Sequence, residues 1–290
     1  MINKTLLGCI FYIVAMLLSV SSNVLVKKTM IDFNLPAWES IAIRQTIIVV
    51  ILVPFMVKEK FNFFNKKTLG INLLRNIIYA LSIGLAHIAL FSIPINTGTS
   101  VQFVTPILAT ILAIFFLKEK SSFYKWFSLI VCICGAVYIQ YPFGRDVNLN
   151  IAYLLLAISV LLKSINSILT RILALNFNTS TCVFYMHIII LFVSLCFFPS
   201  FVFAPLLVWI ILGIVGVIYL TEYILIYKAQ KYCSVSVLQP LDFSKIIHAI
   251  ILSNLVLGEV LTLKQIIGCC VILLGLVVML FDKNHNFNKK

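Results

Sequence analysis

Four ionisable side chains interrupt apolar stretches in the second half of the chain. Lys163 and Glu222 lie in separate stretches, and Asp242 and Lys245 lie three residues apart in a third. A charged side chain at the centre of a bilayer costs roughly 2.5–3.5 kcal/mol on insertion scales, so it is tolerated where it is paired or faces water. The chemistry expected of such residues is the binding of a charged or zwitterionic solute, or the uptake and release of a proton.

The richest of these stretches, residues 234–257, carries Asp242, Lys245 and His248 at spacings of three. Side chains three apart are neighbours on a helix, so Asp242 and Lys245 can form an ion pair. Pro240 removes a helix hydrogen bond just before them, and backbone carbonyls freed there could join a site. The alternative is that Asp242 and Lys245 only neutralise each other.

Other apolar stretches place polar residues at helical spacing. Arg44 cannot lose its charge, so it needs a carboxylate or a wet cavity. Tyr79 shares one helical stripe with Arg75, and Asn166 shares another with Lys163. Lys163 has no local carboxylate and must find one on another helix, line water, or sit neutral.

Titratable and aromatic side chains complete the candidate set. Glu222, Asp242 and His248 are the groups that could couple protons, and several tyrosines offer aromatic faces for a ring. His87 and His187 are isolated in their stretches, so a structural role is favoured for both. The predicted substrate-binding residues are Asn23, Arg44, Tyr79, Lys163, Asn166, Tyr219, Glu222, Tyr223, Asp242, Phe243 and Lys245.

The composition identifies the solvent that surrounds these residues. Of 290 residues, 62% are hydrophobic and only 11% are charged, whereas soluble domains average about 25% charged residues. The chain is therefore predicted to be an all-α membrane protein in contact with lipid. Its net charge of +13 comes from lysines and arginines clustered in short loops, which does not favour nucleic acid as a partner. The sequence shows no catalytic motif, metal-ligand spacing or cofactor-binding motif.

Ten apolar segments are long enough to cross about 30 Å of hydrocarbon. They are roughly residues 6–26, 37–57, 69–91, 97–117, 123–141, 150–170, 181–202, 206–227, 234–257 and 262–281. With a cytoplasmic N-terminus, most basic residues between spans also fall in the cytoplasm, including Lys58, Lys60, Lys66, Lys67, Lys118, Lys120 and Lys125. The bias predicts a multi-pass inner-membrane protein with both termini cytoplasmic.

The two halves of the chain resemble each other at an offset of 140 positions. Glu119 then falls on Glu259, and Gly135 falls on Gly275. The same offset pairs Asn23 with Lys163, which is why Asn23 joins the candidates. Any two leucine-rich hairpins share some similarity, but coincident Glu and Gly favour a repeat. Five spans per copy is an odd number, so residues 1–145 and 146–290 are predicted to form two inverted five-helix repeats.

These motifs resemble the EamA branch of the drug/metabolite transporter superfamily. The resemblance covers essentially the whole chain, through IRQ at Arg44, LRN at Arg75 and FVTPILATILAIFFLKE at residues 103–119. PLDFSKIIHAIILSNLVLGE, at residues 240–259, is similar to a subgroup that includes the S-adenosylmethionine uptake carriers of obligate intracellular bacteria. Lys163 and Lys245 depart from the pattern and favour carboxylates or phosphates.

The resemblance and the intramembrane charges together predict a secondary active transporter that works by alternating access. Its expected substrate is a small polar or zwitterionic metabolite, S-adenosylmethionine or amino-acid-like, with a coupling proton or counter-substrate as a further partner. One alternative is an exporter of drugs or other metabolites with the same fold. A membrane enzyme acting on lipid would need a nucleophile or metal cluster that the sequence lacks, and a non-transporting subunit would leave the charges unexplained.

Overall fold

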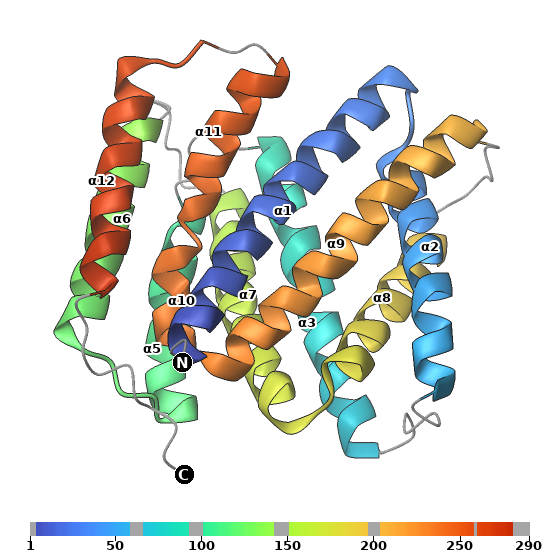
Figure 1. Cartoon of the computed structure of the whole chain (residues 1–290), viewed down its shortest axis with the longest axis horizontal. Helices are drawn as coiled ribbons and strands as arrows, with labels where there is room; N and C mark the ends of the chain where they lie inside the picture. The colour runs from blue at the N-terminus through green and yellow to red at the C-terminus, as the bar shows by residue number, and fades with distance from the viewer. Residues whose placement is uncertain are drawn as a thin grey trace.

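A computed structural model describes residues 4–58, 66–92, 101–141, 151–196, 204–257 and 260–280. All regular elements in these ranges are helices (Figure 1). They are α1 (Lys4–Asp32), α2 (Ala37–Lys58), α3 (Lys66–Ser92), α5 (Val104–Leu117), α6 (Phe123–Gln140), α7 (Ile151–Asn176), α8 (Thr179–Cys196), α9 (Leu206–Tyr232), α10 (Val235–Leu241), α11 (Ser244–Leu257) and α12 (Leu263–Leu280).

Eight helical stretches of the described chain are long and apolar enough to cross a membrane, α10 and α11 counting together as one. Two shorter apolar helices, α5 and the greater part of α12, complete the expected set of ten. Large apolar side chains such as Phe115 and Phe116, 75% and 73% exposed, face outward. An outer surface of this kind is what lipid as the solvent requires.

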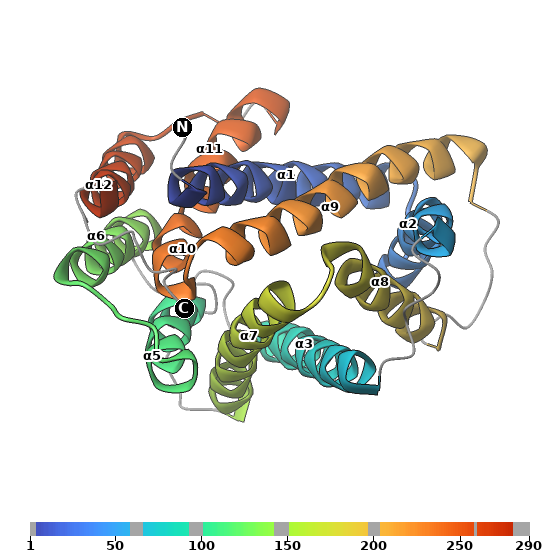
Figure 2. The ribbon, with the colours of Figure 1, turned by 60° about the horizontal axis from the view of Figure 1, so that its bottom comes forward.

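The two halves of the chain pack against each other through pairs of helices, with one helix of each pair from each half. Helix α1 lies along α9 in the same way as α3 lies along α7, while α2 pairs with α8 and α6 with α12 (Figures 1 and 2). The offset makes α7 the counterpart of α1 and α9 the counterpart of α3, so α1 and α3 each pack against the other's counterpart, whereas α2 and α6 each pack against their own. Figure 1 shows α6 and α12 running in opposite directions. The fold is the predicted bundle of two inverted five-helix repeats.

Small residues allow α6 and α12 to approach closely. A Cβ atom added to Gly135 would lie 2.8 Å from Cγ1 of Ile272, and one added to Gly275 would lie 2.7 Å from Sγ of Cys132. The Ser128 hydroxyl donates to the Gly275 carbonyl oxygen at 2.6 Å. Close backbone contact through small residues is typical of helix pairs in membranes.

The ninth predicted span is broken in the middle. The sequence predicts one helix over residues 234–257, but α10 ends at Leu241 and α11 begins at Ser244. Pro240 lacks an amide hydrogen, and the amides of Asp242 and Phe243 bond three residues back, to the oxygens of Gln239 and Pro240. This tighter turn separates the two helices at the charged residue.

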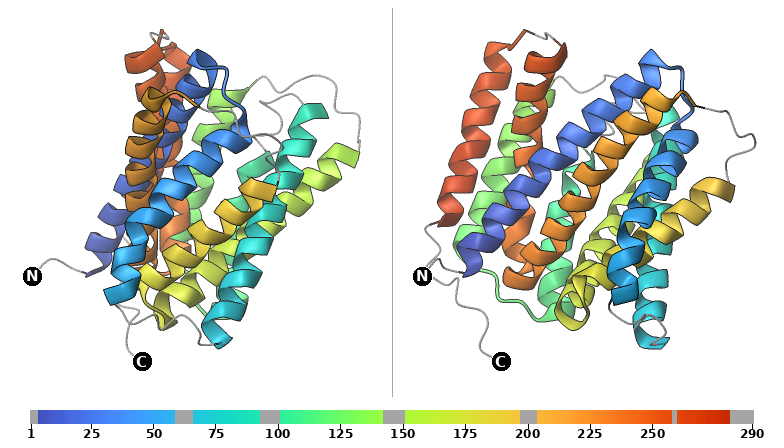
Figure 3. Two further views of the ribbon diagram at one scale, coloured as in Figure 1. Left: turned by 90° about the vertical axis from the view of Figure 1, so that its right-hand side faces the viewer. Right: turned by 45° about the vertical axis from the view of Figure 1, so that its right-hand side comes forward.

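The fourth predicted span has a matching turn at Phe103, just before α5. Phe103 and Phe243 are 140 positions apart, and their ring centroids lie 5.8 Å from each other. The two interrupted spans therefore meet in the interior. The first turn of α1 and the last turn of α12 lie at one end of the bundle (Figure 3).

Candidate functional site

Asp242, at the break between α10 and α11, forms the expected ion pair with Lys245. The Nζ atom of Lys245 lies 2.8 Å from Oδ1 of Asp242. The Tyr12 hydroxyl of α1 donates to the same oxygen at 3.2 Å. The Lys245 and Asp242 side chains are 38% and 33% exposed, so solvent reaches the pair although it lies in the middle of a span.

Lys163 of α7 and Glu222 of α9 lie near this pair without joining it. The Lys163 ammonium donates to Oε1 of Gln102 at 3.4 Å and interacts electrostatically with Asp242. Glu222 is buried and interacts with Lys245 at longer range. No described carboxylate lies within ion-pair distance of Lys163, and no described cation lies within that distance of Glu222.

These five residues form what we call the central ionic cluster: Tyr12, Lys163, Glu222, Asp242 and Lys245. They come from α1, α7, α9 and the α10–α11 break. Side chains that neighbour one another from so many helices face inward, yet the Lys163, Asp242 and Lys245 side chains remain accessible to solvent. Charges within a membrane span are tolerated where they are paired or reach water, and the exposure of these side chains meets that condition.

A group of tyrosines lies beside the central ionic cluster. The hydroxyls of Tyr79 and Tyr223 are 3.0 Å apart, and those of Tyr219 and Tyr223 are 3.3 Å apart. The Arg44 guanidinium of α2 stacks over the Tyr219 ring at 4.2 Å. It also interacts electrostatically with Glu222. Arg44 thus has an aromatic partner and a nearby carboxylate, but no direct ion pair among the described residues.

Arg75 of α3 is held by neutral groups. Its side chain is 2% exposed, its Nε donates to the Thr170 hydroxyl at 3.2 Å, and its Nη1 donates to Oδ1 of Asn76 at 2.9 Å. The guanidinium also lies 5.5 Å from the centroid of Tyr79. Arg75 joins α3 to α7 and contacts the ring of Tyr79.

The remaining predicted residues are less closely tied to this site. Asn23 is exposed on α1, and within the described chain it makes no hydrogen bond or ion pair with the cluster. Phe243 is 3% exposed and packs in an apolar core against Phe103. Asn166 and His248 are half-buried, and Asn166 Oδ1 and His248 Nδ1 have no hydrogen-bond partner in the described chain. Their roles stay predictions.

Sequence reasoning missed several contacts. Tyr12 and Gln102 touch the charged residues, and His187 Nδ1 lies 2.6 Å from Gln45 Oε1. The 140-residue offset could have found Gln102, because it pairs Gln102 with Asp242. The side chain of His87 and all of Glu259 lie outside the described residues.

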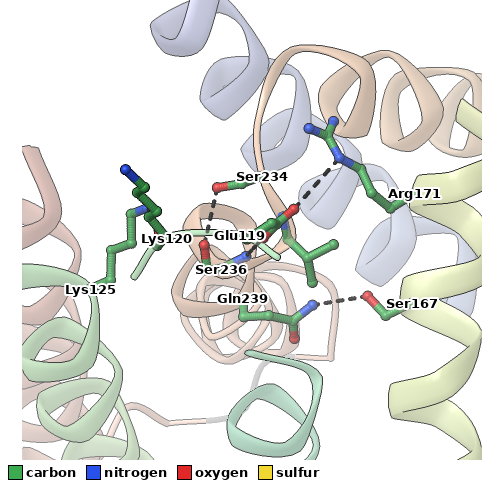
Figure 4. Close-up of polar contacts among 9 residues, drawn as sticks. Glu119, Lys120, Lys125, Ser167, Arg171, Ser234, Ser236 and Gln239 are labelled. Atoms are coloured by element: carbon green, nitrogen blue, oxygen red, sulfur yellow. Dashed lines mark hydrogen bonds and ion pairs between the residues drawn. The ribbon is translucent and has the colours of Figure 1, made fainter. Parts of the chain in front are cut away.

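Another carboxylate, Glu119, whose side chain is 10% exposed, lies just after α5 at the end of the bundle near the start of α1. Its two oxygens accept hydrogen bonds from the first amides of α10, Val235 N at 3.0 Å and Ser236 N at 3.1 Å. Nε of Arg171, on α7, lies 3.7 Å from the same carboxylate (Figure 4). We call these four residues the α5–α7–α10 junction.

The turn that follows α5 positions Glu119. Lys118 ends the helix in the left-handed region, with φ at 52°. Beside the junction, Nε2 of Gln239 donates to the Ser167 hydroxyl at 3.1 Å, which adds a second link between α10 and α7 (Figure 4). The junction thus fixes α10, and with it the break that carries Asp242.

Comparison with known proteins agrees with this architecture. Residues 6–141 and 150–281 each match the EamA-like transporter family. An S-adenosylmethionine uptake transporter of Rickettsia conorii is 23% identical, over 99% of this chain and 97% of its own length. A riboflavin transporter of Vibrio cholerae is 26% identical, over 94% of this chain and 92% of its own. A solved crystal structure shares the fold with a TM-score of 0.73 and 16% identity, over 93% of this chain and 95% of the solved chain.

Proposed function

We propose that this chain, which belongs to the EamA-like transporter family, is a secondary carrier of a small zwitterionic metabolite across the cytoplasmic membrane. Relatives named for S-adenosylmethionine uptake and for riboflavin transport support a small organic metabolite as the solute. The sequence contains no P-loop, and we assign the driving force to an ion gradient or to exchange.

The observation that carries the proposal is the incomplete neutralisation of the charges in and beside the central ionic cluster. Asp242 and Lys245 neutralise each other, whereas Lys163, Arg44 and Glu222 form no ion pair within the described chain. A zwitterion offers a carboxylate to Lys163 and Arg44 and an ammonium group to Glu222. Binding of such a solute would pair charges that are costly to leave alone in a bilayer.

The tyrosines suit a substrate with a further cationic or aromatic part. Tyr79, Tyr219 and Tyr223 present ring faces next to the charged residues. Aromatic faces attract cations, including sulfonium and ammonium groups, by about 0.5–2 kcal/mol. S-adenosylmethionine carries an amino acid group, a sulfonium and a ring, and is therefore the first solute to test.

We assign alternating access to the two inverted repeats, residues 1–145 and 146–290. The α5–α7–α10 junction lies at the end of the bundle that the lysine distribution predicts to be cytoplasmic, and we assign to it the closing of that end. Opening of this junction would expose the central ionic cluster to that side. Glu222, Asp242 and His248 are the titratable groups that could couple protons to the cycle.

Uptake into proteoliposomes tests the proposal. Radiolabelled S-adenosylmethionine is supplied to the purified full-length chain and challenged with amino acids, riboflavin, nucleotides and nucleotide sugars. Asp242→Asn and Lys163→Ala should abolish uptake, whereas Thr221→Ala, at an exposed position next to Glu222, should keep the wild-type rate. Full transport by both site variants would remove these residues from the site, and absence of flux for every solute would reject the carrier itself.

A further inference from the structure

A buried polar group joins α2 to α8 against the tyrosines of α9. His187 Nδ1 and Gln45 Oε1 lie 2.6 Å apart, and both side chains are fully buried. The His187 ring packs edge-to-face on Tyr219 and Tyr223, with centroid distances of 5.8 and 5.9 Å. Arg44 stacks on Tyr219. These five residues are called the Gln45–His187 cluster.

The hydrogen-bonding capacity of this cluster is only partly used. Because the Gln45 carbonyl oxygen can only accept, His187 Nδ1 must donate, and Nε2 of the neutral imidazole is then an acceptor. This Nε2 has no hydrogen-bond partner in the described chain, and neither do Nε2 of Gln45 and Nε of Arg44. Three buried nitrogen atoms are therefore free, two as donors and one as an acceptor.

We propose that the Gln45–His187 cluster is a subsite that recognises the hydrogen-bonding edge of a planar nitrogen heterocycle. In number and type, two free donors and one free acceptor are the complement of an edge that combines carbonyl or ring-nitrogen acceptors with an N–H donor, as in purines, pyrimidines and flavins. A carboxylate has no donor for His187, and an ammonium group has no acceptor for Gln45 or Arg44. The neighbouring tyrosines provide faces on which such a ring can stack.

The inference rests on the proposed carrier function and divides the substrate between two places. The central ionic cluster holds the charged part, and the Gln45–His187 cluster selects the ring. A site built to hydrogen-bond a substrate group rejects analogues that lack the group, because its own buried polar atoms then stay unpaired. Gln45 and His187 are therefore assigned as specificity residues.

The competing role for His187 is purely structural, as a tie between α2 and α8. Two substitutions at His187 and one at Gln45 separate the roles. His187→Asn keeps a donor near the position of Nδ1 for Gln45 and removes the free Nε2, whereas His187→Gln places a polar group near Nε2 and loses the Nδ1 contact. Gln45→Glu keeps the acceptor for His187 and replaces the free donor by an acceptor.

The experiment compares ligands with and without the ring. Uptake by the full-length chain in proteoliposomes is measured for S-adenosylmethionine and for S-methylmethionine, which has the same sulfonium and amino acid groups but no ring, with adenosine and riboflavin as competitors. His187→Asn and Gln45→Glu should weaken apparent affinity for at least one ring-bearing compound about tenfold. Affinity for S-methylmethionine should change less than about twofold, and His187→Gln should retain more ring affinity than His187→Asn.

The outcomes are distinguishable. If both variants bind ring-bearing compounds as the wild type does, or lose both ligand classes equally, the subsite is rejected. If the wild type transports S-methylmethionine but ignores every ring-bearing compound, the subsite is again wrong and the carrier function stands. If the wild type transports none of these solutes or the amino acids, the proposed function itself fails. A melting curve for each variant identifies one that has not folded, and the other variant then decides.

Discussion

Glu119 and Glu222 are two carboxylates at nearly buried positions of one bundle, and their surroundings differ. Both oxygens of Glu119 accept backbone hydrogen bonds from the start of α10, and Arg171 lies 3.7 Å away. Glu222 interacts with the Ser19 hydroxyl, but its Oε2 has no hydrogen-bond partner in the described chain. The cations that interact with it electrostatically, Lys245 and Arg44, lie beyond ion-pair distance.

The difference shows how one chemical group serves two purposes. A carboxylate whose two oxygens both accept hydrogen bonds links helices, and these bonds stabilise the folded protein. A buried acceptor without a partner costs about 1–3 kcal/mol, and a ligand can recover that free energy on binding. Glu119 is therefore expected to govern stability and the closed end of the bundle, and Glu222 is expected to govern transport.

The largest expected effect is on the stability of the junction. Glu119→Gln leaves one amide oxygen for two backbone donors and removes the charge beside Arg171. Loss of one partner from a buried pair destabilises by about 3–5 kcal/mol, and the free energy of unfolding in mixed micelles should fall by that order. The double variant Glu119→Gln/Arg171→Met should recover part of the loss. A decrease below about 1 kcal/mol would show that the contact does not hold α10.

Glu222→Gln is expected to act on transport and leave the fold intact. The substituted amide keeps the shape of the side chain, but it cannot form an ion pair with an ammonium group or take up a coupling proton. Initial uptake rates should fall at least about 100-fold, which corresponds to roughly 2.7 kcal/mol. Unfolding in the same micelles should be unchanged, with Thr221→Ala as the control. A Glu222→Gln variant that is less stable than the wild type but transports at the wild-type rate would show that Glu222, like Glu119, acts on stability.

Arg44→Lys distinguishes charge from stacking on the Glu222 side of the comparison. Lysine keeps the positive charge but lacks the planar group that lies 4.2 Å from the Tyr219 centroid. The KM for uptake should rise about tenfold, or roughly 1.4 kcal/mol. Lys228→Arg, at an exposed position near the end of α9, serves as the control for a basic exchange. An unchanged KM would mean that charge alone is sufficient at Arg44.

The sequence predicts what depends on local spacing. Apolar length predicts the helices, the Asp242–Lys245 spacing predicts their ion pair, and an odd number of spans per repeat predicts inversion. Spacing does not show which helices meet. Nothing near Tyr12 indicates a hydrogen bond to a residue 230 positions away, and nothing near Glu119 indicates that its oxygens receive the amides of α10.

The local sequence also does not decide whether a helix ends at a proline. Pro240 indicates a lost hydrogen bond, but a proline can kink a helix without ending it. The end of α10 at Leu241 depends on tertiary packing, since Phe243 is buried against Phe103 of the other half. The break between α10 and α11 thus depends on contact between the two repeats, and neither repeat specifies it alone.

The smallest expected effect tests a third carboxylate, which lies between the two extremes. Asp242 already has Lys245 at 2.8 Å, and the Tyr12 hydroxyl adds a bond at 3.2 Å to an oxygen that solvent also reaches. Tyr12→Phe therefore removes one partner of several, and KM should rise only about two- to fivefold, or about 0.5–1 kcal/mol. Uptake kinetics measure the change, with Tyr232→Phe as the matched control on α9. A loss as large as that of Glu222→Gln would mean that Asp242 depends on Tyr12 for its position, and that the Asp242–Lys245 pair does not stand by itself.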